Sequence, residues 1–252
     1  MTTGSLFKVV FLFLVVLTIL ITLPYLLFKT EYYIYSNKIW AHRVNSLEKL
    51  KQTQEKYEGI ELDLVFDIST NTFDVNHPPA KSIDLTLDEF LEHLNKHEIK
   101  GLWFDFKNLN KKNTEESFTR LDYLVKKHGI PPEKIIVESQ QPEFLQMFNH
   151  SGFKTSYYLP SALNQLSEKK LKIKLSEIQN KIHLYPTTAI STNINDYIII
   201  KEHFPSKVKY LWAIDKIYTT RVFKNYYQTQ KVLRDPKVEV LLVRVNSKTG
   251  HR

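Results

Sequence analysis

Eight short apolar runs, the first seven each followed by a segment of helical character, are the feature that most constrains the fold of this chain. Regular alternation of strands and helices is typical of a parallel sheet covered by helices. Eight such units starting at Ile39 in a chain of 252 residues predict a compact (β/α)₈ barrel of the TIM type. The predicted strands are residues 39–44, 59–67, 101–108, 134–139, 154–160, 187–194, 207–215 and 238–245.

An open, doubly wound sheet is the competing architecture for the same alternation. Sheets of that kind often bind nucleotides through a glycine-rich loop after a strand. No G-x-G-x-x-G or P-loop motif follows any of the runs, and the chain has only six glycines. With no internal repeat and no long linker, residues 31–252 are expected to form one barrel domain.

The sequence before the barrel holds a long uncharged stretch, "VVFLFLVVLTILITLPYLLF" at residues 9–28. Its twenty residues are enough to cross a bilayer core of ~30 Å as a helix. No small-residue cleavage site follows, so residues 1–30 predict an uncleaved transmembrane helix rather than a signal peptide. The expected localisation is a single-pass membrane protein. Basic residues flank both ends of this helix, so the charge pattern leaves its orientation open. We favour an orientation that places the barrel outside the cytoplasm.

Composition excludes several classes of function. The chain has no cysteine, which rules out disulfides, thiol catalysis and zinc–thiolate sites. The net charge is +8, but the lysines are interleaved with glutamates in helical segments, as on solvated helix faces. We therefore expect no nucleic acid partner. The composition does not indicate an oligomeric state.

Acidic residues interrupt two of the predicted strands. Glu61 and Asp63 are two positions apart in "GIELDLVFD" and so share one face of a strand, opposite Ile60 and Leu62. In a parallel barrel the outer face packs on helices, so both acids should point inward. Asp105 in "GLWFDFKN" has the same parity. The three acids should meet near the carboxyl-terminal mouth of the barrel, where active sites of this fold lie.

Three neighbouring carboxylates repel one another, and a divalent cation would relieve that repulsion. Oxygen ligands favour Mg²⁺ or Ca²⁺ over zinc. His42 and His77 then remain free for proton transfer, while Arg43 and Lys107 could bind phosphate oxygens. A metal, two imidazoles and two cations together predict cleavage of a phosphodiester.

At these positions the sequence resembles a known superfamily. "AHR" at one strand end, "IELDL" at the next, a histidine beyond it and an acid-x-Lys strand are similar to glycerophosphodiester phosphodiesterases and their phospholipase-C-like relatives. The menorin family is closer still, through "WAHRVNS", "IELDLVFD", "NHPP", "LTLDEFL" and "LWFDFKN" within residues 39–109. The resemblance implies a barrel, a divalent metal on the three acids, and acid/base roles for His42 and His77.

The chain departs from the phosphodiesterase pattern in three places. "VNS" runs from "AHR" directly into a helix, where those enzymes have a glycine and a longer loop containing Glu-Asn-Thr. His77 precedes Pro78 rather than an aspartate. Asp105 stands where a glutamate is common, as in the sphingomyelinase D-like relatives.

The predicted function is a membrane-anchored, metal-dependent phosphodiesterase acting on a glycerophosphodiester, a lysophospholipid or a related phosphodiester. A menorin-like binding or scaffold module on the same barrel, without turnover, is the alternative. In that case Arg43 or Lys107 could simply neutralise the acids. A sugar-active barrel is disfavoured, because Glu61 and Asp63 are too close in one strand to flank a glycosidic bond.

Three further residues are candidates for the pocket. Asn45 either contacts a ligand or caps the helix that follows it. Glu138, at the end of the fourth predicted strand, lies on the expected active-site rim. Trp212 is a pocket wall or part of the aromatic core.

Overall fold

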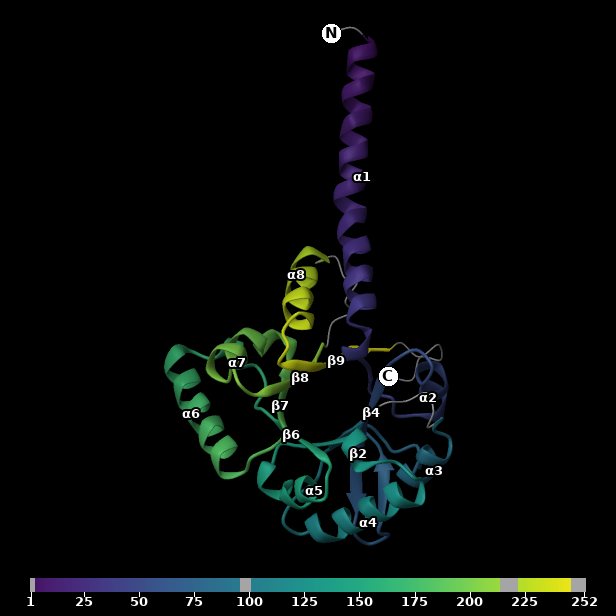
Figure 1. The fold of residues 1–252 in the computed structure, drawn as a ribbon, viewed down its shortest axis with the longest axis vertical. Coiled ribbons are helices and arrows are strands. Elements are labelled where there is room, and N and C mark those ends of the chain that lie inside the picture. The colour runs from purple at the N-terminus through teal and green to yellow at the C-terminus, as the bar shows by residue number, and fades with distance from the viewer. Residues whose placement is uncertain (1–2, 96–100, 214–221, 246–252) are drawn as a thin grey trace.

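The computed structural model describes residues 3–95, 101–213 and 222–245, and its centre is a closed barrel of eight parallel strands (Figure 1). Closure is made by β1 (Ile39–His42), which pairs in parallel with β9 (Val238–Arg244) on one side and with β2 (Gly59–Asp67) on the other. The predicted TIM-type barrel is therefore confirmed. The remaining barrel strands are β4 (Gly101–Phe106), β5 (Ile135–Ser139), β6 (Lys154–Tyr158), β7 (Ala189–Asn193) and β8 (Val208–Trp212).

Each barrel strand lies within a predicted strand or matches one. The predicted strand at 207–215 extends beyond β8, and its residues 214–215 lie outside the described residues. A ninth strand, β3 (Thr72–Val75), lies in what the sequence suggested was a connection, and it pairs antiparallel with the end of β2. The turn between them includes Asn71 at a φ of 52°, a left-handed conformation that asparagine tolerates. The resulting hairpin carries the chain from β2 towards His77.

Helices cover the outside of the barrel. In α4 (Thr114–Lys127), Leu121, Leu124 and Val125 are buried along one face, as expected for an amphipathic helix on a sheet. Ser46 caps α2, because its hydroxyl accepts a hydrogen bond from the main-chain N–H of Lys49 at 3.2 Å. The other covering helices are α3 (Leu87–Glu92), α5 (Gln146–His150), α6 (Glu168–Leu184), α7 (Tyr197–His203) and α8 (Val222–Leu233), and α2 spans Leu47–Thr53.

The inside of the barrel is filled with aromatic side chains at its amino-terminal end. The indole of Trp40 lies against Gly59 and Gly101, and a Cβ atom at those glycines would come within 2.3 Å and 2.1 Å of the Trp40 ring. Further along the interior, the rings of Trp103 and Tyr210 lie 5.4 Å apart between centroids. Only glycine leaves room for Trp40 at both positions, so the barrel floor is a packed core.

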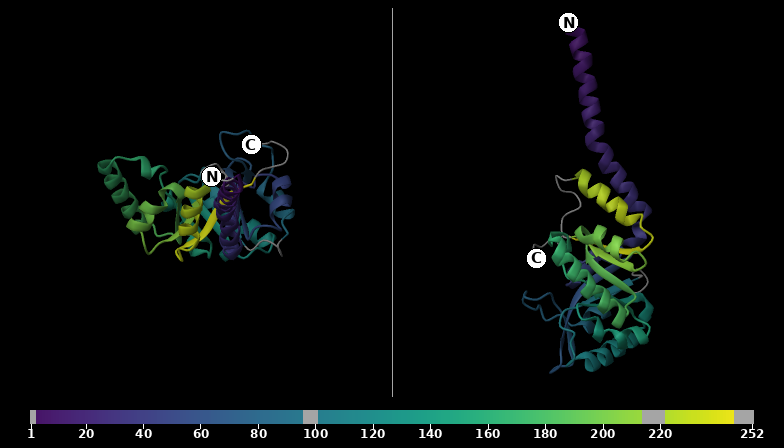
Figure 2. Two further views of the ribbon diagram at one scale, coloured as in Figure 1. Left: turned by 90° about the horizontal axis from the view of Figure 1, so that it is seen from above. Right: turned by 90° about the vertical axis from the view of Figure 1, so that its left-hand side faces the viewer.

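The amino-terminal helix α1 (Thr3–Ile34) projects away from the barrel (Figures 1 and 2). Its lower end packs against the α8 region, where the Arg234 guanidinium pairs with the Glu31 carboxylate. Lys38 adds hydrogen bonds to the carbonyl oxygens of Leu233 and Asp235, both at 2.9 Å. Among the described residues, no helix combines the length and apolarity needed to cross a membrane. The transmembrane helix predicted for residues 9–28 is therefore not confirmed.

Candidate active site

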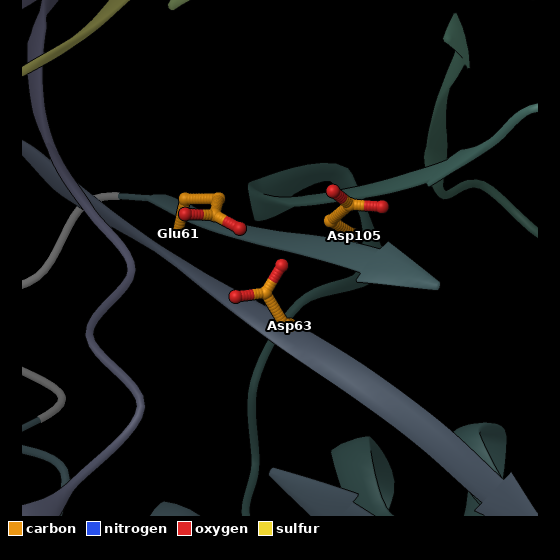
Figure 3. Close-up of side chains that lie close together, drawn as sticks. All are labelled: Glu61, Asp63 and Asp105. Carbon is orange, nitrogen blue, oxygen red and sulfur yellow. The ribbon is translucent and has the colours of Figure 1, made fainter. Parts of the chain in front are cut away.

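The three acids predicted from strand parity lie together in the barrel interior (Figure 3). Asp63 of β2 and Asp105 of β4 are register partners on neighbouring strands, and Glu61 precedes Asp63 by one inward position. One carboxylate oxygen from each residue lies within 4.8 Å of the other two. All three side chains are buried, so the cluster is enclosed by the barrel.

Burial and mutual repulsion shape the charge of this cluster. Burial, reinforced by the neighbouring Asp63 and Asp105 carboxylates, raises the pKa of Glu61 well above its ordinary value. Burial also raises the pKa of Asp105, against the opposing pull of Lys107. Without a further cation, Glu61 and Asp105 therefore hold protons more tightly than exposed carboxylates do.

Lys107 supplies one positive charge to the acids. Its Nζ atom lies 2.7 Å from Asp63 Oδ1 and also pairs with the carboxylate of Asp105. Burial alone would lower the pKa of Lys107, but the Asp105 and Asp63 carboxylates outweigh it and raise that pKa. Lys107 is therefore protonated and forms an ion pair with two of the three acids.

The donor set fits a divalent cation. Carboxylate oxygens on opposite sides of one ion are about 4.2 Å apart around Mg²⁺ and about 4.6–5.2 Å apart around Ca²⁺. The oxygens of Glu61, Asp63 and Asp105 lie within 4.8 Å of one another, a spacing that admits an ion of this size range. Three ionised carboxylates and one ammonium carry a net charge of −2, which a single divalent cation would neutralise.

Both predicted histidines lie beside the acids. His42 Nε2 is 3.7 Å from a Glu61 carboxylate oxygen, and His77 Nε2 is 4.0 Å from Asp63 Oδ1. Burial, with the positive charge of Arg43, lowers the pKa of His42 to about 3. His42 is therefore a neutral imidazole at physiological pH, a form that can accept a proton.

Arg43 contacts both sides of the cluster. Its φ angle of 56° is left-handed, which is uncommon for a residue with a long side chain. In this conformation its main-chain N–H donates to a Glu61 carboxylate oxygen at 2.6 Å. Its Nη2 atom lies 2.8 Å from His77 Nε2, which links the guanidinium to the second predicted histidine.

The three additional candidates lie at different distances from the cluster. Asn45 does not cap a helix, since Ser46 does so, and its side chain instead contacts Asp63. Glu138 lies on β5 as the register partner of Asp105 and is buried, but its oxygens are not part of the three-acid cluster. Trp212 is buried on β8, away from solvent.

One polar residue near the site, Ser191, was not singled out as functional from the sequence alone. Ser191 on β7 donates a hydrogen bond to the Glu138 carboxylate, whose pKa is raised by burial and by Asp105. The inward parity of "AISTN" could have indicated it. Tyr158 forms an edge-to-face pair with Trp212, with 4.7 Å between ring centroids, and burial together with Glu138 raises its pKa to about 12. Tyr158 thus lies against Trp212 and within electrostatic range of Glu138.

Comparison with known proteins identifies what the chain is similar to. Residues 36–131 match the family described as the Menorin N-terminal domain. That stretch contains His42, His77, Lys107 and the three acids. No curated protein matches the chain in sequence.

Solved structures share the barrel. A glycerophosphodiester phosphodiesterase from Parabacteroides distasonis has a TM-score of 0.54 at 17% identity, covering 82% of this chain and 92% of its own. An Oleispira antarctica phosphodiesterase, in complex with its product sn-glycerol-3-phosphate, has a TM-score of 0.57 at 13% identity, covering 84% and 94%. A barrel enzyme of another kind, the phosphoribosyl anthranilate isomerase of Thermococcus kodakaraensis, has a TM-score of 0.50 at 13% identity, covering 82% of this chain and 88% of its own.

Similarity at this level of identity shows the fold alone, because a barrel of this kind hosts unrelated reactions. The resemblance predicted from the sequence is nevertheless confirmed by two separate findings. Residues 36–131 match the menorin N-terminal domain, and the barrel as a whole has the fold of the glycerophosphodiester phosphodiesterases.

Proposed function

We propose that this chain is a metal-dependent phosphodiesterase whose substrate is a glycerophosphodiester, a lysophospholipid or a related phosphodiester. The observation that carries the proposal is the placement of two imidazoles beside one buried acid cluster. His42 Nε2 and His77 Nε2 lie 3.7 Å and 4.0 Å from carboxylates of that cluster. Binding alone needs no pair of proton-transfer groups, whereas cleavage of a P–O bond needs an acid and a base.

In this proposal Glu61, Asp63 and Asp105 hold Mg²⁺ or Ca²⁺. The bound ion would neutralise charge on a non-bridging phosphate oxygen and so favour attack at phosphorus. Arg43 and Lys107 would bind other phosphate oxygens, the guanidinium through paired hydrogen bonds. Lys107 already faces the acids, so it is well placed to contact a phosphate held beside them.

The two histidines would move the protons. One accepts the proton of the nucleophilic hydroxyl, which belongs to water or to the substrate, and the other donates a proton to the leaving alkoxide. The roles are assigned to the pair, since both rings lie at the same cluster. Tyr158 and Trp212 would form an aromatic wall beside the site.

The test is a cleavage assay on the full chain purified in detergent. Glycerophosphodiesters, lysophospholipids and an aryl phosphodiester are offered with Mg²⁺, Ca²⁺ or a chelator. We expect chelator-sensitive cleavage that His42→Ala abolishes and that His150→Ala, a change at an exposed histidine, preserves. Cleavage that is insensitive to chelator, or that is equally fast in both variants, would contradict this mechanism.

A binding module without turnover is the second candidate, and one observation favours it. Lys107 already pairs with Asp63, and Arg43 with His77, in this structure, so both cationic side chains have partners without a substrate. Such a module would bind a phosphodiester or a divalent cation and release it unchanged. Cation binding in calorimetry, with no product from any substrate of the panel, would support this candidate over the enzyme.

We also propose that α1 attaches the barrel to a membrane. Apolar side chains are exposed along this helix, among them Phe11 at 61% and Leu20 at 57%. Exposed apolar surface of this extent is typical of a binding region. Flotation of the full chain with phospholipid vesicles is expected, and replacing Phe11 and Leu20 by aspartate should reduce it. Equal flotation of both proteins would contradict attachment through these side chains.

A further inference from the structure

The chain makes an ordered set of contacts with β2 immediately after β1 ends. Residue 43 donates its main-chain N–H to the Glu61 carboxylate at 2.6 Å, and residue 44 donates its N–H to the Glu61 carbonyl oxygen at 2.8 Å. The left-handed conformation at Arg43 lets these two donors reach the same residue. The backbone after β1 therefore runs along the part of β2 that carries the acids.

Asn45 completes this set with its side chain. Its Oδ1 atom accepts a hydrogen bond from the main-chain N–H of Asp63 at 3.0 Å. Its Nδ2 atom donates to Asp63 Oδ2 at 2.6 Å. Both ends of one amide group are therefore engaged by one residue, which fixes the backbone and the carboxylate of Asp63 relative to each other.

This pairing divides the two oxygens of Asp63 between different partners. Oδ2 is held by Asn45, while Oδ1 lies 2.7 Å from Lys107 Nζ and 4.0 Å from His77 Nε2. The terminal torsion of an aspartate has a broad energy profile, so without the Asn45 bond only the Lys107 ion pair, among the described residues, would restrain the rotation of the carboxylate. The Asn45 amide thus keeps Oδ1 directed at the lysine and the histidine.

We propose that Asn45 is a positioning residue, which acts through Asp63 by presenting its Oδ1 atom to a bound divalent cation. The inference rests on the proposed function, since it concerns the same acid cluster. Groups that orient a metal ligand through a hydrogen bond commonly change metal affinity by about 10–100-fold when removed. The short "VNS" segment after β1 thereby contributes to the site without touching the substrate.

The experiment measures the affinity of the full chain in detergent for Ca²⁺ and, separately, for Mg²⁺, with no substrate present, by calorimetry. Asn45→Ala removes both hydrogen bonds, and Asn45→Asp keeps the shape but places an oxygen against Asp63 Oδ2. Ser46→Ala is the matched control, because it removes the cap of α2 at the next residue and leaves Asp63 untouched. Thermal unfolding with a chelator reports the stability of each variant.

We expect both Asn45 variants to weaken cation binding about 10-fold or more, while Ser46→Ala binds as the unmodified chain does. Unchanged affinity in the Asn45 variants that fold would overturn the inference and leave the proposed metal site standing. An equal loss in Ser46→Ala would also overturn it, by showing that any disturbance of this segment has the same effect. If the unmodified chain binds neither ion, the proposed metal site fails and the inference fails with it.

Discussion

Lys107 Nζ lies 2.7 Å from Asp63 Oδ1, within a cluster whose acids are buried. Removing one partner of a buried ion pair leaves the other charge uncompensated, at a cost of about 3–5 kcal/mol. Lys107→Met should therefore lower the free energy of unfolding of the cation-free protein by about 3 kcal/mol. Denaturant unfolding in the presence of a chelator measures this loss.

A divalent cation should stabilise the Lys107→Met variant more than it stabilises the unmodified chain. In the variant, the cation no longer competes with the lysine ammonium group for the acids. The rise in Tm on adding Ca²⁺ is the measurement. Lys111→Met, at an exposed position, is the control and should behave as the unmodified chain does. An equal rise in Tm for all three proteins would show that Lys107 and the cation do not share the acids.

Glu61 and Glu138 are both buried glutamates with raised pKa values, yet they differ in position. Glu61 belongs to the three-acid cluster, and Glu138 accepts a hydrogen bond from Ser191. Glu61→Gln should weaken cation binding at least 10-fold, since it removes a charged ligand. Glu138→Gln should leave the affinity close to that of the unmodified chain, since Glu138 is not part of the three-acid cluster. Calorimetry measures the cation affinity of the two variants. A larger loss of affinity in Glu138→Gln than in Glu61→Gln would show that the ion does not bind at the three-acid cluster.

His42 should make the protein less stable in acid. Its pKa is about 3 in the folded chain, against an ordinary value of 6.5. The unfolded chain therefore binds a proton at His42 below pH 6.5, whereas the folded chain does so only near pH 3. The stability contributed by the neutral ring is complete above pH 6.5 and is lost progressively as the pH falls towards 3.

At pH 5 this loss corresponds to about 2 kcal/mol. His42→Gln removes it, so the difference in unfolding free energy between pH 7.5 and pH 5 should be smaller in the variant by about that amount. Urea unfolding at the two pH values measures it. The raised pKa of Glu61 acts in the opposite direction in both proteins, so the comparison isolates the histidine. Identical pH dependence would mean that folding does not lower the pKa of His42.

Gly101→Ala should destabilise the barrel floor. A Cβ atom there would lie 2.1 Å from Cη2 of Trp40, so the indole or the strand must move. Overpacking of this kind costs about 1–3 kcal/mol. Trp40→Phe shortens the ring and should reduce the cost of Gly101→Ala when the two changes are combined. Unfolding free energies of the two single variants and the double variant form the test, and simple additivity would contradict the contact.

The barrel and the acid cluster could be predicted because both depend on strand parity. Glu61, Asp63 and Asp105 alternate with apolar residues, and alternation alone places them on the inner face. The strands also begin and end within a few residues of the predicted positions. These features are local in the sequence, which is why the pattern of residue types is enough to find them.

Side-chain contacts between neighbouring strands could not be predicted from the sequence. Asn45 and Asp63 are 18 positions apart, and nothing in "VNS" distinguishes a helix cap from a partner for a carboxylate. The sequence likewise could not show whether Lys107 pairs with the acids or contacts a substrate, because that depends on distances in the folded chain. The hairpin of β3 was missed because a four-residue strand between turns gives too short a pattern, although Phe73 and Val75 do alternate with polar residues.

The aromatic floor formed around Trp40, Trp103 and Tyr210 has a consequence for the sequence of events in the site. Within the described part of the chain, the acids lie above a packed interior, with Arg43 and His77 on the side of the strand ends. Whatever binds the acids must enter and leave by that same side. Under the proposed function, a substrate phosphate bound by Arg43 would block the exit of an ion on the acids, so binding should be ordered, with the cation arriving first and departing last.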